Sequence, residues 1–503
     1  MNLFWKIFPL VAGAWLLAGC TTVKPVATED QSEAGQDRRV QAHAHYAAAL
    51  IHEMKDEPAA AAADFYQAAL LDPGDEDLAM EAGEELWEHG NTGKAIEVLS
   101  RASGYPGVSG ELFARLGYFE AQTGRYEAAI AADRQAVRRS PRLAVGWQNL
   151  ALNLLHQKQA GEALVMLRGA VEETNVDVDF HLVIAETLVG LGREYPPKKN
   201  EADALALESL ALADQLAPQD PQALLRLADG FNLLGKTRRA AEIYSQLLNQ
   251  AGDQPELKQN LRERLTDLYL KTGDRANATS QLQGILQDDP ANPAAHFELG
   301  ELAYEQDHLE LAADSFHKTL LLRPDFEQAY YDLAQTQLAM DQPDMALATI
   351  ADARKRFPDR YSGELLCALA AARLKKYDDA IGHFTTAEIL AKVSEPDRLN
   401  EQFYYEVGAT YEAKGDIVEA EKFLQKSLAI APGFADAQNY LGYMWADRGT
   451  NLPEARHLIE QAVKSTPDDP AYLDSLAWVL FKLKQPEKAL PATKGKIFQN
   501  RFI

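Results

Sequence analysis

The stretch HFELGELAYEQDHLELAADSFHKTLLLRP, residues 296–324, decides the fold because its pattern returns 34 residues further along the chain. The next segment, which begins AYYDLAQTQ at residue 329, has the same spacing. The matching pairs are His296 with Tyr330, Leu299 with Leu333, Gly300 with Ala334, Ala312 with Ala346, Phe316 with Ile350 and Pro324 with Pro358. A fixed period of this length indicates an array of stacked structural repeats.

Helix-forming residues dominate these repeats. Ala, Leu, Glu, Gln and Lys fill windows of helical periodicity that Gly, Asp and Pro interrupt, and runs of β-branched residues are scarce. We therefore expect an all-α chain. The pattern closely resembles the tetratricopeptide repeat (TPR), with its bulky residue, leucine, small residue and later alanine and proline. The resemblance implies a solenoid of antiparallel helix pairs wound into a right-handed superhelix.

The repeats are expected to fill most of the chain. At this period there are about thirteen units over residues 41–490, several of them degenerate. In the fifth unit, REYPPKKNEADA at residues 193–204 is expected to insert a loop between the two helices. The tail PATKGKIFQNRFI, residues 491–503, places Pro491 and Gly495 inside the last expected helix. This atypical tail is interpreted either as a truncated end or as a divergent real one.

The N-terminus reads as a secretion signal. Lys6 precedes an apolar segment too short to span a bilayer as a mature helix, and LAGC ends at Cys20. These residues resemble the lipobox of bacterial lipoproteins, which implies a signal peptide over residues 1–19 and lipidation of Cys20. The alternative is an ordinary signal peptide or an uncleaved anchor. Residues 20–40 are expected to form a flexible tether. Thr21 after the cysteine implies, by the same resemblance, an outer-membrane protein facing the periplasm.

Composition and motifs argue against several classes of function. The formal net charge of −25 would repel a phosphate backbone, so nucleic acid is not expected as a partner. Motifs for a nucleophile elbow, a zinc protease, a phosphate loop or a dinucleotide fold are missing from the sequence. We expect no catalytic residue, no metal site and no cofactor, and therefore no enzyme. Cys367 lies in an apolar helical context and is interpreted as a small core residue.

A binding surface is what remains. In TPR proteins the side chains one step beyond the core positions of each first helix face the concave groove. By this resemblance the partner-binding groove includes Phe297, Tyr304, Tyr331, Tyr405, Asn439, Tyr443 and Trp478. The alternative for each ring is packing between successive repeats. On this acidic background the client is expected to present a neutral or basic segment.

The expected function is a membrane-anchored TPR scaffold that binds a periplasmic protein or peptide in its groove, for envelope assembly, proteolysis or secretion. An accessory subunit of an enzyme or transferase with its catalytic domain elsewhere is the competing hypothesis, and a purely structural spacer is a third. The repeat pattern specifies a fold far more strongly than a client.

Overall fold

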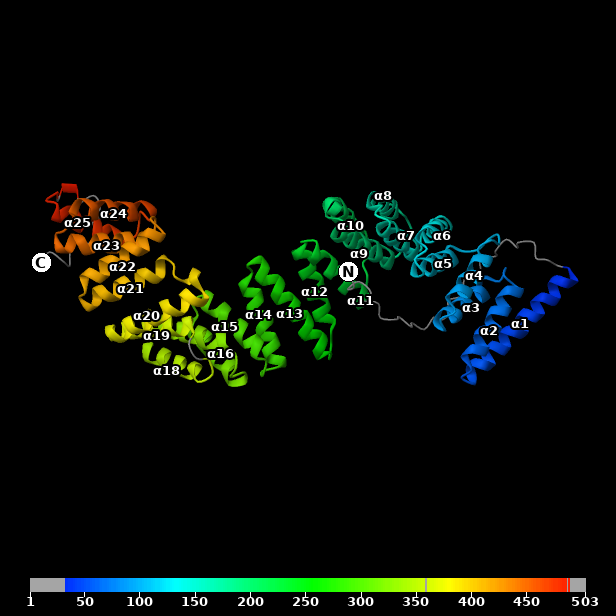
Figure 1. Cartoon of the computed structure of the whole chain (residues 1–503), viewed down its shortest axis with the longest axis horizontal. Helices are drawn as coiled ribbons and strands as arrows, with labels where there is room; N and C mark the ends of the chain where they lie inside the picture. The colour runs from blue at the N-terminus through cyan, green and yellow to red at the C-terminus, as the bar shows by residue number, and fades with distance from the viewer. Residues whose placement is uncertain (1–31, 358–359, 486, 489–503) are drawn as a thin grey trace. The chain divides into compact units, whose positions relative to one another are not determined.

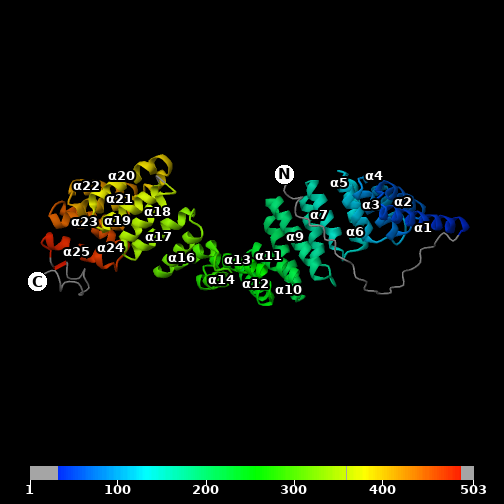
Figure 2. The same cartoon turned by 90° about the horizontal axis from the view of Figure 1, so that it is seen from below.

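The computed structural model describes residues 32–357, 360–485 and 487–488, which contain 25 α-helices and two short 3-10 helices. The chain divides into two compact units, unit 1 over residues 1–247 and unit 2 over residues 248–503. Within each unit, successive helices lie side by side along the chain (Figure 1, Figure 2). The expected all-α class is confirmed.

The helices of unit 1 are α1 Glu33–Met54, α2 Pro58–Leu71, α3 Glu76–Glu88, α4 Thr92–Ala102, α5 Gly110–Gln122, α6 Tyr126–Arg139, α7 Ala144–His156, α8 Ala160–Val171, α9 Val178–Glu194, η1 Pro196–Lys198, α10 Lys199–Gln215 and α11 Pro221–Leu233. Helix α12, Thr237–Gln250, crosses the boundary between the units.

The helices of unit 2 are α13 Pro255–Thr272, α14 Arg275–Asp288, α15 Pro293–Glu305, α16 Leu309–Leu322, α17 Glu327–Ala339, α18 Pro343–Arg354, α19 Tyr361–Arg373, α20 Tyr377–Ser394, η2 Pro396–Arg398, α21 Glu401–Lys414, α22 Ile417–Ile430, α23 Ala435–Arg448, α24 Leu452–Ser465 and α25 Pro470–Lys482.

These helices form antiparallel pairs, each made of an odd-numbered helix, here called an A helix, and the even-numbered B helix that follows it. Within each unit, each B helix also packs on the next A helix of that unit, and neighbouring A helices such as α15 and α17 touch directly. Twelve pairs are followed by α25, which is an A helix. The predicted solenoid of helix pairs is confirmed within each unit.

A recurrent turn joins the helices of a pair. Nearly every A helix is followed by one residue with positive φ: Asp56, Gly90, Gly124, Lys158, Gly235, Gly273, Asp307, Asp341, Lys375, Gly415, Gly449 and Lys484. Lys484 adopts this conformation after α25, and the next backbone N–H, that of Gln485, donates to the Leu480 carbonyl at 2.9 Å. The thirteenth repeat therefore keeps the turn that leads toward a B helix. Residues 489–503, which include the expected atypical tail, lie outside the described residues.

The predicted tether over residues 20–40 is wrong at its C-terminal end, because α1 begins at Glu33. The Ser32 hydroxyl caps this helix by accepting a hydrogen bond from the Gly35 backbone N–H, and Glu33 lies in the first turn, where a negative charge is favoured. Residues 33–40 lack an apolar period, so periodicity alone missed them. Helix-forming side chains and a good cap were sufficient.

The prediction of an inserted loop in the fifth repeat is also wrong. The inserted residues extend α9 and α10, each of which has 17 residues, and only Tyr195 and the 3-10 turn η1 separate the two helices. Pro196 and Pro197 stop α9 because they cannot continue a helix interior, and the Lys, Glu and Ala residues beyond them favour a helix again. The insertion therefore lengthens a helix pair.

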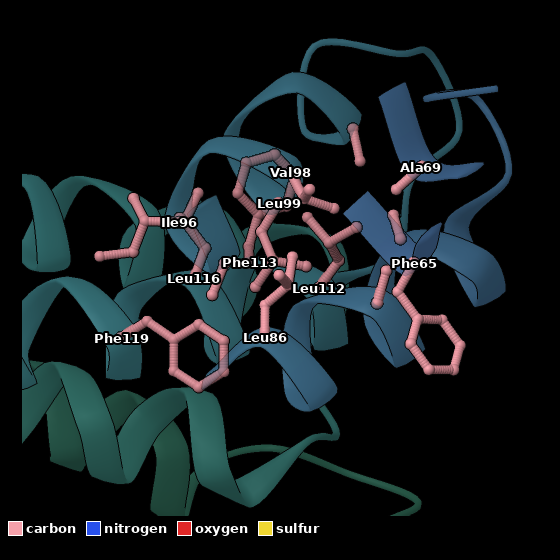
Figure 3. Packing of buried hydrophobic residues seen from close by; sticks show 14 of the residues in the cluster. Phe65, Ala69, Leu86, Ile96, Val98, Leu99, Leu112, Phe113, Leu116 and Phe119 are labelled. Atoms are coloured by element: carbon pink, nitrogen blue, oxygen red, sulfur yellow. The ribbon is translucent and has the colours of Figure 1, made fainter. Parts of the chain in front are cut away.

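The core consists of the faces that neighbouring helices turn toward one another. In unit 1 one buried cluster extends from α1 to α6 and includes Phe65, Leu86, Leu99, Leu112 and Phe119 (Figure 3). In unit 2 a smaller cluster combines Phe316 of α16 with residues of α15 and α17. This second cluster supports the surface described below.

Candidate functional site

Helix α15 contributes Glu301, Tyr304 and Glu305 to the lining of a cavity in unit 2. The Asn292 side chain caps the helix by accepting a hydrogen bond from the Ala295 backbone N–H at 3.0 Å, and Pro293 occupies the first turn. Gly300 faces Phe316 of α16, and a Cβ atom at this position would lie 2.7 Å from the ring. A glycine is therefore required for the ring to approach α15, where its side chain is 1% exposed.

A cavity of about 160 Å³ opens beside this ring. Its lining comes from α15, α16 and α17 and consists of Glu301, Tyr304, Glu305, Phe316, Asp332 and Gln335. The Gln335 side-chain amide donates a hydrogen bond to the Tyr304 hydroxyl at 3.0 Å and so joins α17 to α15. The cavity combines an aromatic ring, an aromatic floor, an amide and three carboxylates.

Two carboxyl groups that line the cavity, Glu301 and Asp332, have raised pKa values. Burial raises the pKa of Glu301, and the nearby carboxylates of Asp332, Glu298 and Glu305 raise it further. The pKa of Asp332 is also raised by burial, against the lowering effect of a hydrogen bond from Gln328. Like charges and partial withdrawal from water both disfavour ionisation, so these groups carry their charges at a cost in free energy.

The acidic surface continues onto the preceding A helix. Burial raises the pKa of Glu298, and the next largest causes are Glu263 and Asp267 of α13. Carboxylates from α13, α15 and α17 thus influence one another across three consecutive A helices. We call this set the acidic strip; its members are Glu263, Asp267, Glu298, Glu301, Glu305 and Asp332.

Of the residues predicted for the groove, Tyr304 lines the cavity. Phe297 is half-buried between repeats, with its ring 4.5 Å from that of Phe326 and 5.6 Å from that of Phe316. The prediction that Tyr331 lines an open groove is wrong, because its side chain is only 8% exposed. Its hydroxyl donates a hydrogen bond to the Glu327 carboxylate at 3.0 Å. Both rings pack between repeats, because successive A helices approach closely enough to enclose them.

Tyr405 likewise serves packing. Its ring makes edge contacts with Phe434 and Tyr440, both at 5.7 Å, and burial raises its pKa to about 12. Asn439 and Tyr443 lie half-buried on α23. Trp478 on α25 is half-buried, stacks on Phe481 at 5.7 Å and lies under the Lys482 ammonium at 4.8 Å. The seven predicted residues therefore extend from α15 to α25 and do not form one site.

Sequence reasoning missed the charged lining of the cavity. Glu301 follows Gly300 directly, and Gln335 follows Ala334, which is the same phase that selected Tyr443 after Gly442. The signal was present, but aromatic residues were preferred over carboxylates at that phase. Asp332 lies outside this phase and joins the site only through the packing of α17 on α15.

The two cysteines have separate outcomes. Cys20, the predicted lipidation site, lies outside the described residues. Cys367 is 3% exposed in a cluster with Tyr331, Ile350 and Leu366, and burial raises its thiol pKa, so its interpretation as a core residue is confirmed. Among residues 32–357, 360–485 and 487–488, no group of three or more His, Cys, Asp or Glu side chains is arranged to hold a metal ion.

Comparison with protein families agrees with the helix pairs. Models described as tetratricopeptide repeat match residues 80–144, 222–253 and 252–501. The chain is a tetratricopeptide repeat protein. TPR domains as a family bind protein or peptide partners.

Curated relatives match only parts of this TPR protein. A segment of 191 residues, 38% of the chain, is 35% identical to the TPR repeat-containing protein PA4667 of Pseudomonas aeruginosa and covers 31% of it. Another of 167 residues, 33% of the chain, is 25% identical to the human Protein O-mannosyl-transferase TMTC3 and covers 18% of it. The matched segments thus span less than a third of either relative.

Among solved structures, a tetratricopeptide repeat protein from Parabacteroides merdae aligns with a TM-score of 0.42 at 15% identity, over 52% of this TPR chain and all of its own. As for membrane segments, the described helices include none whose length and hydropathy suffice to cross a bilayer.

Proposed function

We propose that the chain is a lipid-anchored scaffold of the cell envelope that holds a periplasmic protein or peptide on the A-helix side of unit 2. The observation that carries the binding part is the cavity beside Tyr304, where carboxylates, an amide and aromatic rings converge from three helices. Pockets that combine apolar surface with a few convergent polar groups are the usual form of recognition sites.

The anchoring part is supported by the sequence around Cys20. An apolar segment of signal-peptide length and the small residues Ala18 and Gly19 precede this cysteine directly. Acylation there would attach the repeats to a membrane surface, provided that more than one acyl chain is added. Thr21 favours the outer membrane, with the repeats facing the periplasm. The role of such a scaffold is to bring its client to the membrane for assembly, proteolysis or secretion.

The substitution Cys20→Ala is expected to move the full-length chain from the membrane fraction to the soluble or unprocessed fraction, because it removes the acylation site. The measurement is fractionation of cells with a high-salt wash, followed by mass spectrometry of the N-terminal peptide. As a matched control, Cys367→Ala removes the other thiol and is expected to leave the distribution unchanged. A Cys20→Ala chain that remains in the washed membrane with unchanged mobility would refute the anchor.

A further inference from the structure

We infer that the A-helix face of α13, α15 and α17 binds a basic segment of a client protein, and that one arginine or lysine side chain of this segment enters the cavity beside Tyr304. This inference rests on the proposed scaffold function and names the chemistry of the client. Its basis is the combination of a cavity, an aromatic wall and carboxylates that lack cationic partners.

The charges at the centre of the acidic strip are uncompensated. At its edges, Glu305 forms an ion pair with Arg275 at 2.7 Å, and Asp267 forms one with Lys271 at 2.6 Å. By contrast, none of the ion pairs among the described residues includes Glu298, Glu301 or Asp332. A cation supplied from outside would therefore find carboxylates that no cationic side chain of the described chain pairs with.

The shape of the cavity favours a long basic side chain over a metal ion. The carboxylates are not grouped closely enough to ligate a metal within the part of the chain that the structure describes. A lysine or arginine stem instead can lie along the Phe316 floor and the Tyr304 ring, with its charged end between Glu301 and Asp332. A guanidinium suits this arrangement best because it pairs with carboxylates through two parallel hydrogen bonds.

The free energy of such a contact follows from the state of the free site. Burial disfavours the charged forms of Glu298, Glu301 and Asp332 by raising their pKa, and repulsion from neighbouring carboxylates adds to this effect at Glu298 and Glu301. A bound cation would replace this repulsion with attraction between opposite charges. The face also spans three consecutive A helices, which suits an extended segment carrying several basic residues.

The test measures binding of a fluorescent peptide built from Arg-Ala-Ala repeats to the full chain by anisotropy at moderate salt. The double variant Glu301→Gln, Asp332→Asn is expected to weaken binding by about tenfold to a hundredfold, because the amide oxygens still accept hydrogen bonds but no longer carry the charges that strengthen them. Its folding should persist, because neutral amides at these positions remove repulsion. Circular dichroism of the variant verifies that it is folded.

The matched control is Glu310→Gln, Asp314→Asn on α16, which makes the same change in net charge on a B helix of the same repeat. It is expected to alter binding by less than about twofold, since distant exposed charges are screened by salt. A peptide of Glu-Ala-Ala repeats should not bind. Equal losses in the two double variants, no loss in either, or binding of the glutamate peptide would each overturn the inference.

This experiment separates the inference from the proposed scaffold function. If the arginine peptide fails to bind but an envelope protein is still captured on the A-helix side of unit 2, the scaffold stands and the basic client is refuted. If neither is found there, the proposed binding function fails as well.

Discussion

Asp133→Asn is expected to raise the stability of unit 1 by about 2 kcal/mol near pH 8 and to lower it near pH 4. Asp133 lies on α6, is 0% exposed and faces Gly117 of α5. One carboxylate oxygen accepts a hydrogen bond from the Asn153 amide at 2.8 Å, while the other accepts none among the described residues. Burial raises the pKa of this carboxyl from 3.8 to about 7, against a lowering effect of Asn153.

The direction of the effect follows from proton uptake. Between the ordinary pKa of 3.8 and the folded value of about 7, the unfolded chain releases the proton of Asp133 and the folded chain keeps it. The contribution of Asp133 to the free energy of unfolding is therefore full below pH 3.8 and falls as the pH rises to about 7. The total loss is about 4 kcal/mol, at about 1.4 kcal/mol per pKa unit. Asparagine avoids this loss but introduces an amide N–H pair with no partner, which costs about 2 kcal/mol at every pH.

Hydrogen exchange of α5, α6 and α7 measures this difference, with intrinsic exchange rates corrected for pH. Protection in the variant should exceed that in the parent chain near pH 8 and fall below it near pH 4. Comparing the two chains at each pH cancels the titration of all other groups. A difference that does not change with pH would contradict the assignment of a buried, largely protonated Asp133.

Phe316→Ala is expected to destabilise unit 2 by about 3–5 kcal/mol, the range for removal of a buried phenylalanine ring. The ring is 1% exposed, contacts Phe297 at 5.6 Å and fills the space that Gly300 leaves. Its removal would leave an empty space in the core that is continuous with the cavity beside Tyr304. Urea unfolding followed by circular dichroism measures the loss, and a two-step transition would show the units unfolding separately.

Leu321→Ala on the same helix is the control, since this side chain is 67% exposed and its truncation should change stability by less than about 0.5 kcal/mol. If Phe316→Ala cost no more than this control, Phe316 would not be the packed floor of the site. The cavity itself would then lack a rigid boundary.

The repeat could be predicted from the sequence because each helix pair requires small residues at equivalent positions. Gly408 and Gly442 must be small, as an added Cβ would lie 2.8 Å from Leu424 in the first case and 2.7 Å from Ile459 in the second. Their partners on the B helices include Ala420 and Ala455, both 0% exposed. Such positions carry the same constraint in each pair, so a fixed period reveals them.

The candidate site was less predictable because it depends on differences between repeats. Phe297 and Tyr405 occupy equivalent positions on α15 and α21, and the structure encloses both with rings of the following repeat, Phe326 and Phe434. Periodicity identifies the face of a helix but not whether a neighbour covers it. The acidic strip was missed for the same reason, since its carboxylates interact only after three A helices are packed.

Site-specific photocrosslinking in intact cells identifies what the cavity binds, with a photoreactive phenylalanine analogue placed either at Tyr304 in the cavity or at Leu321 on α16. We expect a covalent adduct with a client protein from position 304 and none from position 321. Mass spectrometry should map that adduct to a segment rich in arginine or lysine. An adduct from position 321 with none from position 304, or one that maps to an acidic segment, would contradict the account.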